Sequence, residues 1–302
     1  MAMRQVGWSG RCSAPPDLGG WVVSMSLPNF LVIGARRAGT SLLHHKVLRA
    51  HPEIYVPVQR KETHYFDLYY DRGLEWYQSY YPTDQAAGRF RAIGEVTPDY
   101  LASEEAPGRI HQLLPECRLI AILRNPVEQA WSDYRYRRRG RNERRDFKTF
   151  LEDPAALSGG LYHRHLQRYL ALFRREALLV LIYEELVQNP GRELGRLTSF
   201  LDVPMIWSDP AVLLEERINP GEIPRFRRSF ALARQAGRLL ARHDFNWPVR
   251  LAKRLGVRRW FGRSASEPSM SAAERKYLAE FYREDVRQLS VLLQRDLDVW
   301  QL

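Results

Sequence analysis

The sequence has little cysteine and no long apolar run. Its 302 residues include two cysteines, Cys12 and Cys117, too few for a structural zinc site and fewer than a secreted disulfide framework uses. No stretch reaches the ~18 uninterrupted apolar residues that a membrane-spanning helix needs. The residues before Pro28 lack the apolar segment of a signal peptide. We therefore expect a soluble, cytoplasmic protein without a transmembrane segment.

The sequence does contain enough apolar material for a core, together with an excess of positive charge. Hydrophobic residues make up 45% and aromatic residues 12%, which excludes wholesale disorder. Lys and Arg total 46 against 35 Asp and Glu, a formal net charge of +11. This surplus favours anionic partners: nucleic acid, phosphorylated cofactors, acidic glycans or a membrane surface. Charge alone does not choose among them.

Short apolar strands alternate with amphipathic helices along the first two thirds of the chain. The expected strands are 30–33, 54–58, 119–123 and 178–183, and the expected helices begin near 40 and 126 and span 162–173 and 193–201. This alternation predicts an α/β fold, a P-loop-like parallel sheet flanked by helices on both faces, with a helical C-terminal elaboration.

We expect one domain after a loose tail. The tail covers 1–28, the domain covers 29–302, and the helical C-terminal part of that domain runs from about 210 to 302. No glycine- and serine-rich linker divides the chain. Met25 stands just before the first strand and is an alternative translation start to Met1.

Two helix starts carry capping signals. Asn125 is expected to cap a helix that has Pro126 at its first position, where proline lacks only a hydrogen bond that would be absent anyway. Ser271 and Glu274 have the spacing of a capping box. The apolar stripe of the helix that follows is Leu278, Tyr282, Val286, Leu289 and Leu293.

The first strand leads into a glycine-spaced loop. The loop and the residues after it read Gly34-Ala35-Arg36-Arg37-Ala38-Gly39-Thr40-Ser41. This is the glycine spacing of a P-loop, whose backbone N–H groups and helix N-terminus face an anion. Thr40 stands where a nucleotide hydrolase has lysine, and the cations stand earlier, at Arg36 and Arg37. The alternative interpretation is a basic strand-to-helix turn without a ligand.

A second phosphate-binding element is expected one strand further on. Arg124 ends a buried strand, and Ser132 lies eight residues later, about two helical turns, on the same side of the next helix. A guanidinium and a hydroxyl suit a second phosphate, although each is also common at such positions without a ligand. Two phosphate sites at adjacent strand ends indicate a nucleotide with phosphates on both sides of its ribose.

These two segments resemble the 5′-phosphosulfate loop and the 3′-phosphate motif of sulfotransferases that use 3′-phosphoadenosine 5′-phosphosulfate (PAPS). The resemblance is closest to the heparan sulfate (glycan) type, in a soluble, bacterial-like form, and covers roughly residues 30–205. It extends through Lys61–Asp67, Gly73–Tyr77, Glu95–Tyr100 and Gly160–Tyr162. It implies metal-independent transfer of a sulfuryl group from PAPS to an acceptor hydroxyl or amine, with 3′-phosphoadenosine 5′-phosphate (PAP) as product.

The resemblance also implies which residues bind the donor. These are Arg36, Arg37, Ala38, Gly39, Thr40 and Ser41 at the 5′-phosphosulfate, and Arg124 and Ser132 at the 3′-phosphate. Arg37 would act in catalysis by stabilising the negative charge that develops on the leaving phosphate. The glycan enzymes usually have Lys there, whereas tyrosylprotein sulfotransferases resemble this chain in having Arg, which does not copy a lysine's single-point proton donation.

Glu62 matches the residue that takes the proton from the acceptor hydroxyl in glycan sulfotransferases. His64 would share its face in an extended segment and is a rival base. A carboxylate base works best with a raised pKa, and the neighbouring Lys61 would lower it. In the alternative interpretation, Lys61 and Glu62 are a solvated surface pair.

The chain departs from the glycan pattern at Val96, where the relatives often have a lysine near the sulfuryl group. The acceptor, or the way it is held, is therefore expected to differ from heparan sulfate.

Glu95 is either a second carboxylate in the cleft or a helix- or turn-capping group. We expect the acceptor group on a glycan, lipid or small metabolite, which could be anionic.

Two basic runs have no role assigned by the motifs. The run from Arg135 to Arg145 holds seven arginines in eleven residues and is either a solvated face or a rim that attracts an acidic acceptor or the cofactor. Arg225–Arg228 is a second cluster. No recognised nucleic-acid fold accompanies either run, so a nucleic-acid partner is not expected. His163 and His165 have no evident third ligand, so a metal site is not expected.

Two rival functions belong to other classes. One is a P-loop kinase or NTPase, against which the missing P-loop lysine counts. The other is a non-catalytic basic module for RNA or an anionic polymer, which would not need Glu62 or the paired phosphate motifs.

Overall fold

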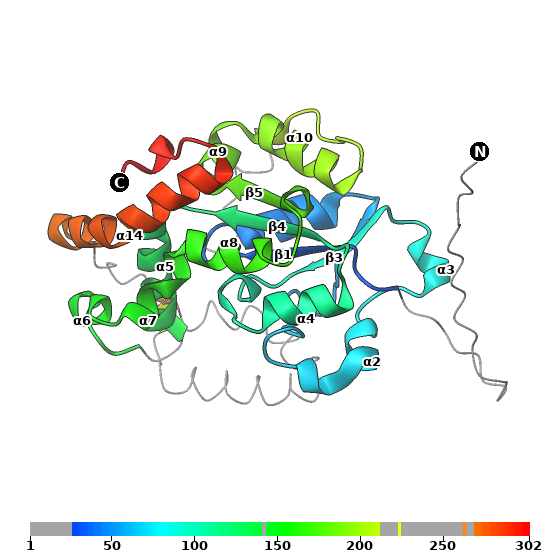
Figure 1. Ribbon diagram of the computed structural model, residues 1–302, viewed down its shortest axis with the longest axis horizontal. Helices are drawn as coiled ribbons and strands as arrows, with labels where there is room; N and C mark the ends of the chain where they lie inside the picture. Colours follow the sequence, from blue (N-terminus) through cyan, green and yellow to red (C-terminus); the bar gives the residue numbers. More distant parts are fainter. Residues whose placement is uncertain (1–25, 141–142, 212–222, 225–261, 264–268) are drawn as a thin grey trace, which may run out of the picture.

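The computed structural model describes residues 26–140, 143–211, 223–224, 262–263 and 269–302. A five-stranded sheet with strand order β2-β3-β1-β4-β5 lies at its centre, and every strand pair is parallel (Figure 1). The strands are β1 (Phe30–Gly34), β2 (Ile54–Tyr55), β3 (Ala92–Val96), β4 (Arg118–Leu123) and β5 (Leu178–Ile182). The predicted parallel sheet is confirmed.

The strands differ from the sequence prediction in three places. The pattern does not predict β3. In β2 only two residues pair, and Pro57, which has no N–H to donate to a sheet, follows soon after. Finally, β5 ends at Ile182 because Tyr183 already begins a helix.

Helices connect and cover the strands. In chain order they are α1 (Thr40–Leu42), α2 (Gly73–Gln78), α3 (Asp84–Ala87), α4 (Ala106–Leu113), α5 (Pro126–Gly140), α6 (Phe147–Leu151), α7 (Pro154–Leu157), α8 (Tyr162–Leu170), α9 (Tyr183–Gln188), α10 (Pro190–Leu201) and α14 (Ala272–Leu293). A π-helical segment (Leu43–Val47) and a 3₁₀ turn (Leu48–Ala50) continue α1.

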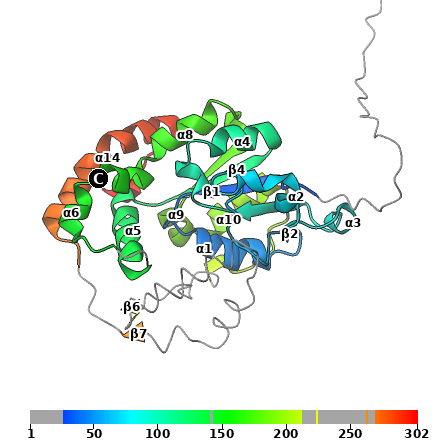
Figure 2. The same ribbon diagram turned by 90° about the horizontal axis from the view of Figure 1, so that it is seen from below.

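The sheet separates two apolar cores. Alternate residues of β1 face opposite sides, so Phe30 and Val32 enter one core and Leu31 and Ile33 the other. The first core is closed by α9, α10 and the segment that continues α1, and the second by α4, α5, α8 and α14 (Figure 2). The expectation of helices on both faces is therefore confirmed.

Both predicted capping signals form. The backbone N–H of Val127 donates to Asn125 Oδ1 at 2.9 Å, at the start of α5. Ser271 and Glu274 make the reciprocal capping box of α14. Four residues of the predicted apolar stripe are buried against the main core, and Leu293 is half-buried.

The C-terminal prediction is described only in part. The helix α14 is present, whereas 212–222, 225–261 and 264–268 lie outside the described residues, and so does the Arg225–Arg228 cluster. Within the described part, a short antiparallel pair, β6 (Ile223–Pro224) and β7 (Gly262–Arg263), accompanies the helix. Residues 1–25 of the expected tail are likewise outside. None of the described helices is long and apolar enough to cross a membrane.

Candidate functional site

The carboxyl ends of the central strands gather the predicted site residues at one edge of the sheet. In a parallel α/β sheet, ligands bind beyond this edge, where the loops leave the strands. The loop after β1 holds Arg37, the one after β3 holds Asp99, and the one after β4 begins at Arg124. Residues that are far apart in the sequence are therefore placed on neighbouring loops.

The loop after β1 has the backbone that its glycines predict. Gly39 has φ of +100°, a conformation that L side chains rarely adopt. A Cβ at this position would also lie 2.6 Å from the Tyr183 ring, so glycine is required for two reasons. Thr40 is buried and begins α1, and Ser41 is half-buried beside it.

The two arginines of the loop have different surroundings. Arg36 donates to Asp99 Oδ1 at 3.2 Å and also forms a short ion pair with Asp133. Burial opposes the charge of Arg36, but these two carboxylates raise its pKa overall. Its guanidinium therefore fixes the loop to its neighbours.

Arg37 brings the two predicted phosphate motifs together. Its Nε donates to Ser132 Oγ at 3.2 Å, across 95 positions of sequence, and its guanidinium lies 4.9 Å from the centre of the Tyr136 ring. The pKa of Arg37 is lowered by burial and by the positive charges of Arg36 and Arg124, against the opposite effect of Asp133. Such crowding of cations favours the binding of an anion.

Arg124 stands at the end of β4 and is partly exposed. Its guanidinium lies 5.3 Å from the centre of the Tyr183 ring and 3.9 Å from Glu128 Oε2. The distance to Glu128 makes this a loose ion pair, and a better-placed anion can compete for the guanidinium.

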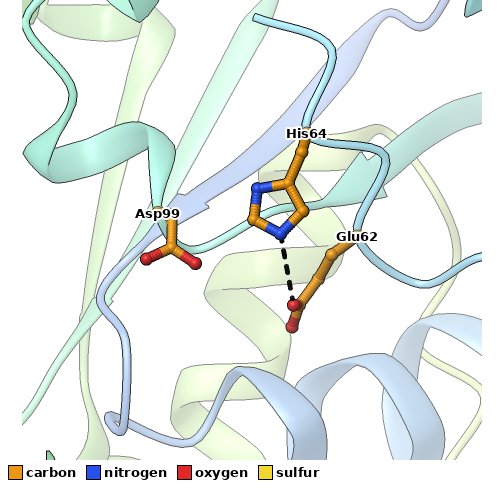
Figure 3. A group of neighbouring side chains, drawn as sticks. All are labelled: Glu62, His64 and Asp99. Atoms are coloured by element: carbon orange, nitrogen blue, oxygen red, sulfur yellow. Dashed lines mark ion pairs between the residues drawn. The ribbon is translucent and has the colours of Figure 1, made fainter. Parts of the chain in front are cut away.

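Glu62 and His64 form a charged cluster facing the phosphate loop. His64 Nε2 lies 3.6 Å from Glu62 Oε2, the ion pair drawn in Figure 3, and His64 Nδ1 bonds to Asp67 Oδ2 at 3.0 Å. Burial disfavours a charge on the imidazole, but the bonds with Asp67 and Glu62 raise the pKa of His64 to about 10. Burial alone would raise the pKa of Glu62, yet His64 and Lys61 lower it to about 2.

The backbone of this cluster is not the extended segment that the sequence suggests. His64 has φ of +55°, in the left-handed region, and no strand covers 61–66. The premise of a strand-like alternation is therefore wrong. Glu62 and His64 nevertheless meet, because Thr63 between them is held in the core.

Lys61 connects the cluster to the phosphate loop, which the sequence analysis does not foresee. Its Nζ lies 2.9 Å from Glu62 Oε1 and donates to Ser41 Oγ at 3.1 Å. The Lys61 side chain is 20% exposed and that of Glu62 36%, so the two form a half-buried pair tied to the phosphate loop, not a fully solvated surface pair. No pattern along the chain relates Lys61 to Ser41, whereas the three-residue spacing of His64 and Asp67 could have suggested their pairing.

Glu95 takes neither of the two roles considered for it. It is completely buried in β3, where it accepts hydrogen bonds from four hydroxyl groups. These belong to Thr63 (a short bond), Tyr77 (2.9 Å), Tyr100 (3.0 Å) and Thr97 (3.2 Å). The prediction of a cleft carboxylate or a cap is wrong, because the sheet directs this side chain into the core, where it holds Thr63.

One group of potential metal ligands lies at the site. Ligand atoms of Glu62, His64 and Asp99 lie within 4.8 Å of one another (Figure 3). The raised pKa of His64 and its bond to Asp67 indicate an imidazolium, whose proton already balances the carboxylates. The cluster is therefore explained by ion pairing.

Three arginines of the run after the 3′-phosphate motif form contacts within the protein, while Arg141 lies outside the described residues. Arg137 pairs with Asp133 at 2.7 Å, and Arg138 donates to the Tyr134 hydroxyl at 3.2 Å. Arg145 pairs with Glu143 and Asp153. Arg145 is 38% exposed and its partner Asp153 37%, which fits a solvated face at this end of the run, and the rim for an acidic acceptor stays a prediction.

His165 and His163 do not form a ligand cluster among the described residues. His165 is buried on α8, and its Nε2 bonds to the carbonyl of Ser158 at 2.7 Å. Its burial lowers its pKa to about 4, so it remains neutral in the core. The backbone of His163 donates to Asp285 of α14 at 3.0 Å. Both residues therefore contribute to packing.

Comparisons with known proteins agree with the motifs. A family model described as a sulfotransferase domain matches residues 27–219. Heparan sulfate glucosamine 3-O-sulfotransferase 6 of Homo sapiens is 35% identical over 191 residues, which are 60% of this chain and 54% of that protein. Heparan sulfate glucosamine 3-O-sulfotransferase 3B1 of Homo sapiens is 34% identical over 199 residues, 62% of this chain and 49% of that protein.

The chain spans about half the length of these curated relatives. Among solved structures, a sulfotransferase from Alicyclobacillus acidocaldarius shares the fold, with a TM-score of 0.61 and 24% identity. That match covers 92% of this chain and all of the other.

Proposed function

Because the chain belongs to the sulfotransferase domain family, we propose that it transfers a sulfuryl group from PAPS to an acceptor hydroxyl or amine. The hydrogen bond between Arg37 and Ser132 carries the proposal, since it joins two phosphate motifs 95 positions apart into one cationic site. Lys61 links that site to Glu62 through Ser41. A donor site and a candidate base are thus adjacent.

The residues at the sheet edge fit a donor with two separate phosphate groups. Arg37, the hydroxyls of Thr40 and Ser41, and the backbone N–H groups from Ala38 onward are the partners proposed for the 5′-phosphosulfate. The donor supplies an activated sulfuryl group, and its transfer leaves PAP. Burial, and then the nearby charges of Arg36 and Arg124, lower the pKa of Arg37, and a bound anion would offset both effects.

The 3′-phosphate is assigned to Arg124 and Ser132. Among the described residues, Arg124 contacts the Tyr183 ring and forms a loose ion pair with Glu128 at 3.9 Å, which a phosphate can replace. Among the residues expected to bind the donor, Arg36 is the one whose side chain we assign to a structural role instead. It keeps its bonds to Asp99 and Asp133 and shapes the loop, and its backbone remains part of the phosphate cradle.

Glu62 is the proposed general base. The acceptor oxygen forms the new bond to sulfur, its proton goes to Glu62, and the electrons of the broken S–O bond remain on the leaving phosphate. His64 is an imidazolium at neutral pH because its pKa is about 10, so it has no free lone pair for a proton. Its role is to orient Glu62.

A pKa of about 2 makes Glu62 a weak base while Lys61 and His64 both contact it. An anion on the phosphate loop attracts Lys61, which already touches Ser41. Movement of this ammonium away from Glu62 would raise the pKa of the carboxyl group. Donor binding would thereby make Glu62 a better base.

The acceptor is proposed to carry its hydroxyl or amine on a glycan, lipid or small metabolite. The relatives are named for glucosamine units of heparan sulfate, which supports a glycan. Val96 stands where the glycan enzymes often have a lysine, and this difference argues for a glycan other than heparan sulfate.

The experiment that tests the function uses nucleotides first. In magnesium-free buffer, PAP should raise the melting temperature of the protein, and ATP should do so much less. Incubation of extracts with the protein and labelled PAPS should then transfer label to an acceptor, identified by mass spectrometry. A stronger effect of Mg-ATP than of PAP would contradict the proposal and favour a kinase.

A further inference from the structure

A cavity with a mixed charged and apolar lining lies beside Arg36 and Ala35 of the loop after β1. Its volume is about 140 Å³, and its charged lining consists of Arg36, Asp99, Asp133 and Arg137. The rest of the wall comes from the residues after β3, from α5 and from the segment after α7, and includes Ala102, Gln129 and Gly159. Neither the sequence motifs nor the comparisons assign a role to this cavity.

The four charged side chains of the cavity neutralise one another. Arg36 bridges Asp99 and Asp133, and Arg137 donates to the second oxygen of Asp133 at 2.7 Å. Two cations therefore face two anions. An ion of either sign gains no net Coulomb attraction here, and it would lose part of its hydration on entry.

The cavity nevertheless offers hydrogen bonds. Asp99 uses its Oδ1 for Arg36, and within the described residues no hydrogen bond or ion pair reaches its Oδ2. Its side chain is 30% exposed, compared with 6% for Asp133. A carboxylate of this kind accepts a hydroxyl proton, while guanidinium groups donate to hydroxyl oxygens.

Asp99 also connects the cavity to the proposed base. Its carboxylate lies within 4.8 Å of ligand atoms of Glu62 and His64 (Figure 3). Figure 3 shows His64 between the side chains of Asp99 and Glu62. A molecule bound to the Asp99 carboxylate is therefore held close to Glu62.

We propose that this cavity is an acceptor subsite for an uncharged, hydroxyl-rich group, such as a neutral sugar ring, held by Asp99 and Arg36. The inference rests on the proposed function, which it deepens by naming the acceptor class. The cavity accommodates a group the size of one ring, far below the 300–1,000 Å³ of sites for larger ligands. The acceptor's sugar ring that occupies the cavity, next to the hydroxyl that receives the sulfuryl group, is therefore expected to be uncharged.

The test measures direct binding, so it does not depend on turnover. Saturation-transfer NMR with the full chain compares methyl β-glucopyranoside, methyl β-glucuronide and methyl β-glucosaminide, which carry zero, negative and positive charge. The neutral glycoside should give the strongest transfer. Ala102→Leu, which fills the cavity wall, should reduce its signal at least about 5-fold through steric exclusion. The matched control is Ala155→Leu, an exposed position outside the cavity, and should retain the signal.

A second variant tests the charge balance. Asp99→Asn leaves the cavity with one excess cation, so the glucuronide-to-glucoside affinity ratio should rise about 5-fold. If the wild-type protein prefers a charged glycoside, or if Ala102→Leu binds the neutral one undiminished, the subsite assignment is wrong. A failure of PAP to stabilise the protein, with intact glucoside binding, would overturn the sulfotransferase proposal and leave the cavity as a binding site for a neutral sugar, without an acceptor role.

Discussion

Single side chains determine the chemistry around Glu62. Lys61 contacts both this carboxylate and Ser41. The imidazolium of His64 lies between Glu62, which faces its Nε2, and Asp67, which faces its Nδ1. The low pKa of Glu62 is therefore a property of its neighbours, opposed by its own burial. Each of these contacts can be removed one at a time.

Lys61→Met removes a cation beside Glu62. The pKa of Glu62, about 2 in the wild type, should rise because the carboxylate loses a partner that stabilises its charged form. Since the base must be ionised, the acid limb of the kcat/KM profile should shift to higher pH by about 1 unit. Lys61→Arg keeps the charge and should keep the limb near its original position. An unshifted limb in Lys61→Met would contradict the coupling.

Glu62→Gln removes the proposed base and retains the shape of the side chain. Turnover should fall about 10²- to 10⁴-fold, the usual contribution of general base catalysis, while the melting-temperature shift with PAP stays the same. Glu116→Gln, which removes a carboxylate that is 89% exposed, is the comparison for a general loss of charge. A fully active Glu62→Gln enzyme would return the role of base to His64.

Arg124→Ala should weaken PAP binding about 10- to 100-fold, because the 3′-phosphate loses a charge-assisted partner. Isothermal titration calorimetry measures the change. Adenosine 5′-phosphate lacks the 3′-phosphate and serves as the internal control, since its affinity should be the same in both proteins. An equal loss for both nucleotides would place Arg124 elsewhere on the ligand.

At the scale of elements, a buried hydroxyl network holds the segment of the proposed base against the sheet. Glu95 lies in β3, next to β1 in the sheet, with Leu31 as its pairing neighbour. Its bond to Thr63 therefore connects the residues around Glu62 to the strand that leads into the phosphate loop. Burial raises the pKa of Glu95, although its four hydroxyl donors oppose this effect.

This raised pKa has a signature in the pH dependence of stability. The folded state holds the proton of Glu95 more tightly than the unfolded state, whose reference value is 4.5. As pH rises from about 4.5 through the folded pKa, the free energy of unfolding should fall, and Glu95→Gln should lack this part of the fall. Urea unfolding from pH 4 to 8 measures both proteins. A constant difference between the two curves would mean that Glu95 does not titrate in this window.

For the whole molecule, the positively charged side chains differ in whether a carboxylate within the protein pairs with them. Arg137 on α5 is paired with the buried Asp133, and Arg145, which follows this helix, is paired with Glu143 and Asp153. Arg37 and Arg124, by contrast, stand near each other at the sheet edge, where Arg37 has a lowered pKa. The charge that matters for the donor is therefore local, and the net charge of +11 does not measure it.

These cations, together with Lys61, lead us to expect activity without a divalent metal. Guanidinium and ammonium groups can neutralise the phosphates that Mg²⁺ neutralises in kinases. Sulfuryl transfer measured after dialysis against EDTA should match the untreated rate within about 2-fold, and added Mg²⁺ should not raise it. A large loss on chelation, restored by a metal, would assign Glu62, His64 and Asp99 to an ion instead.

The sequence by itself determined the features that depend on neighbours along the chain. The left-handed Gly39, the Asn125 cap and the alternation of strands and helices follow from local backbone preferences and periodicity. Ser132 was found from its spacing of eight residues after Arg124, whereas Glu62 was identified by its match to a residue of the glycan sulfotransferases.

Only the tertiary structure decided which charges meet. Arg36 and Arg37 are adjacent and chemically alike, yet one pairs with Asp99 and Asp133 and the other with Ser132. Two further examples are the hydrogen bond of buried Glu95 with Thr63, across 32 positions of sequence, and that of Lys61 with Ser41, across 20 positions. Coulomb energies and desolvation depend on distances in space, which the order of residues along a chain does not contain.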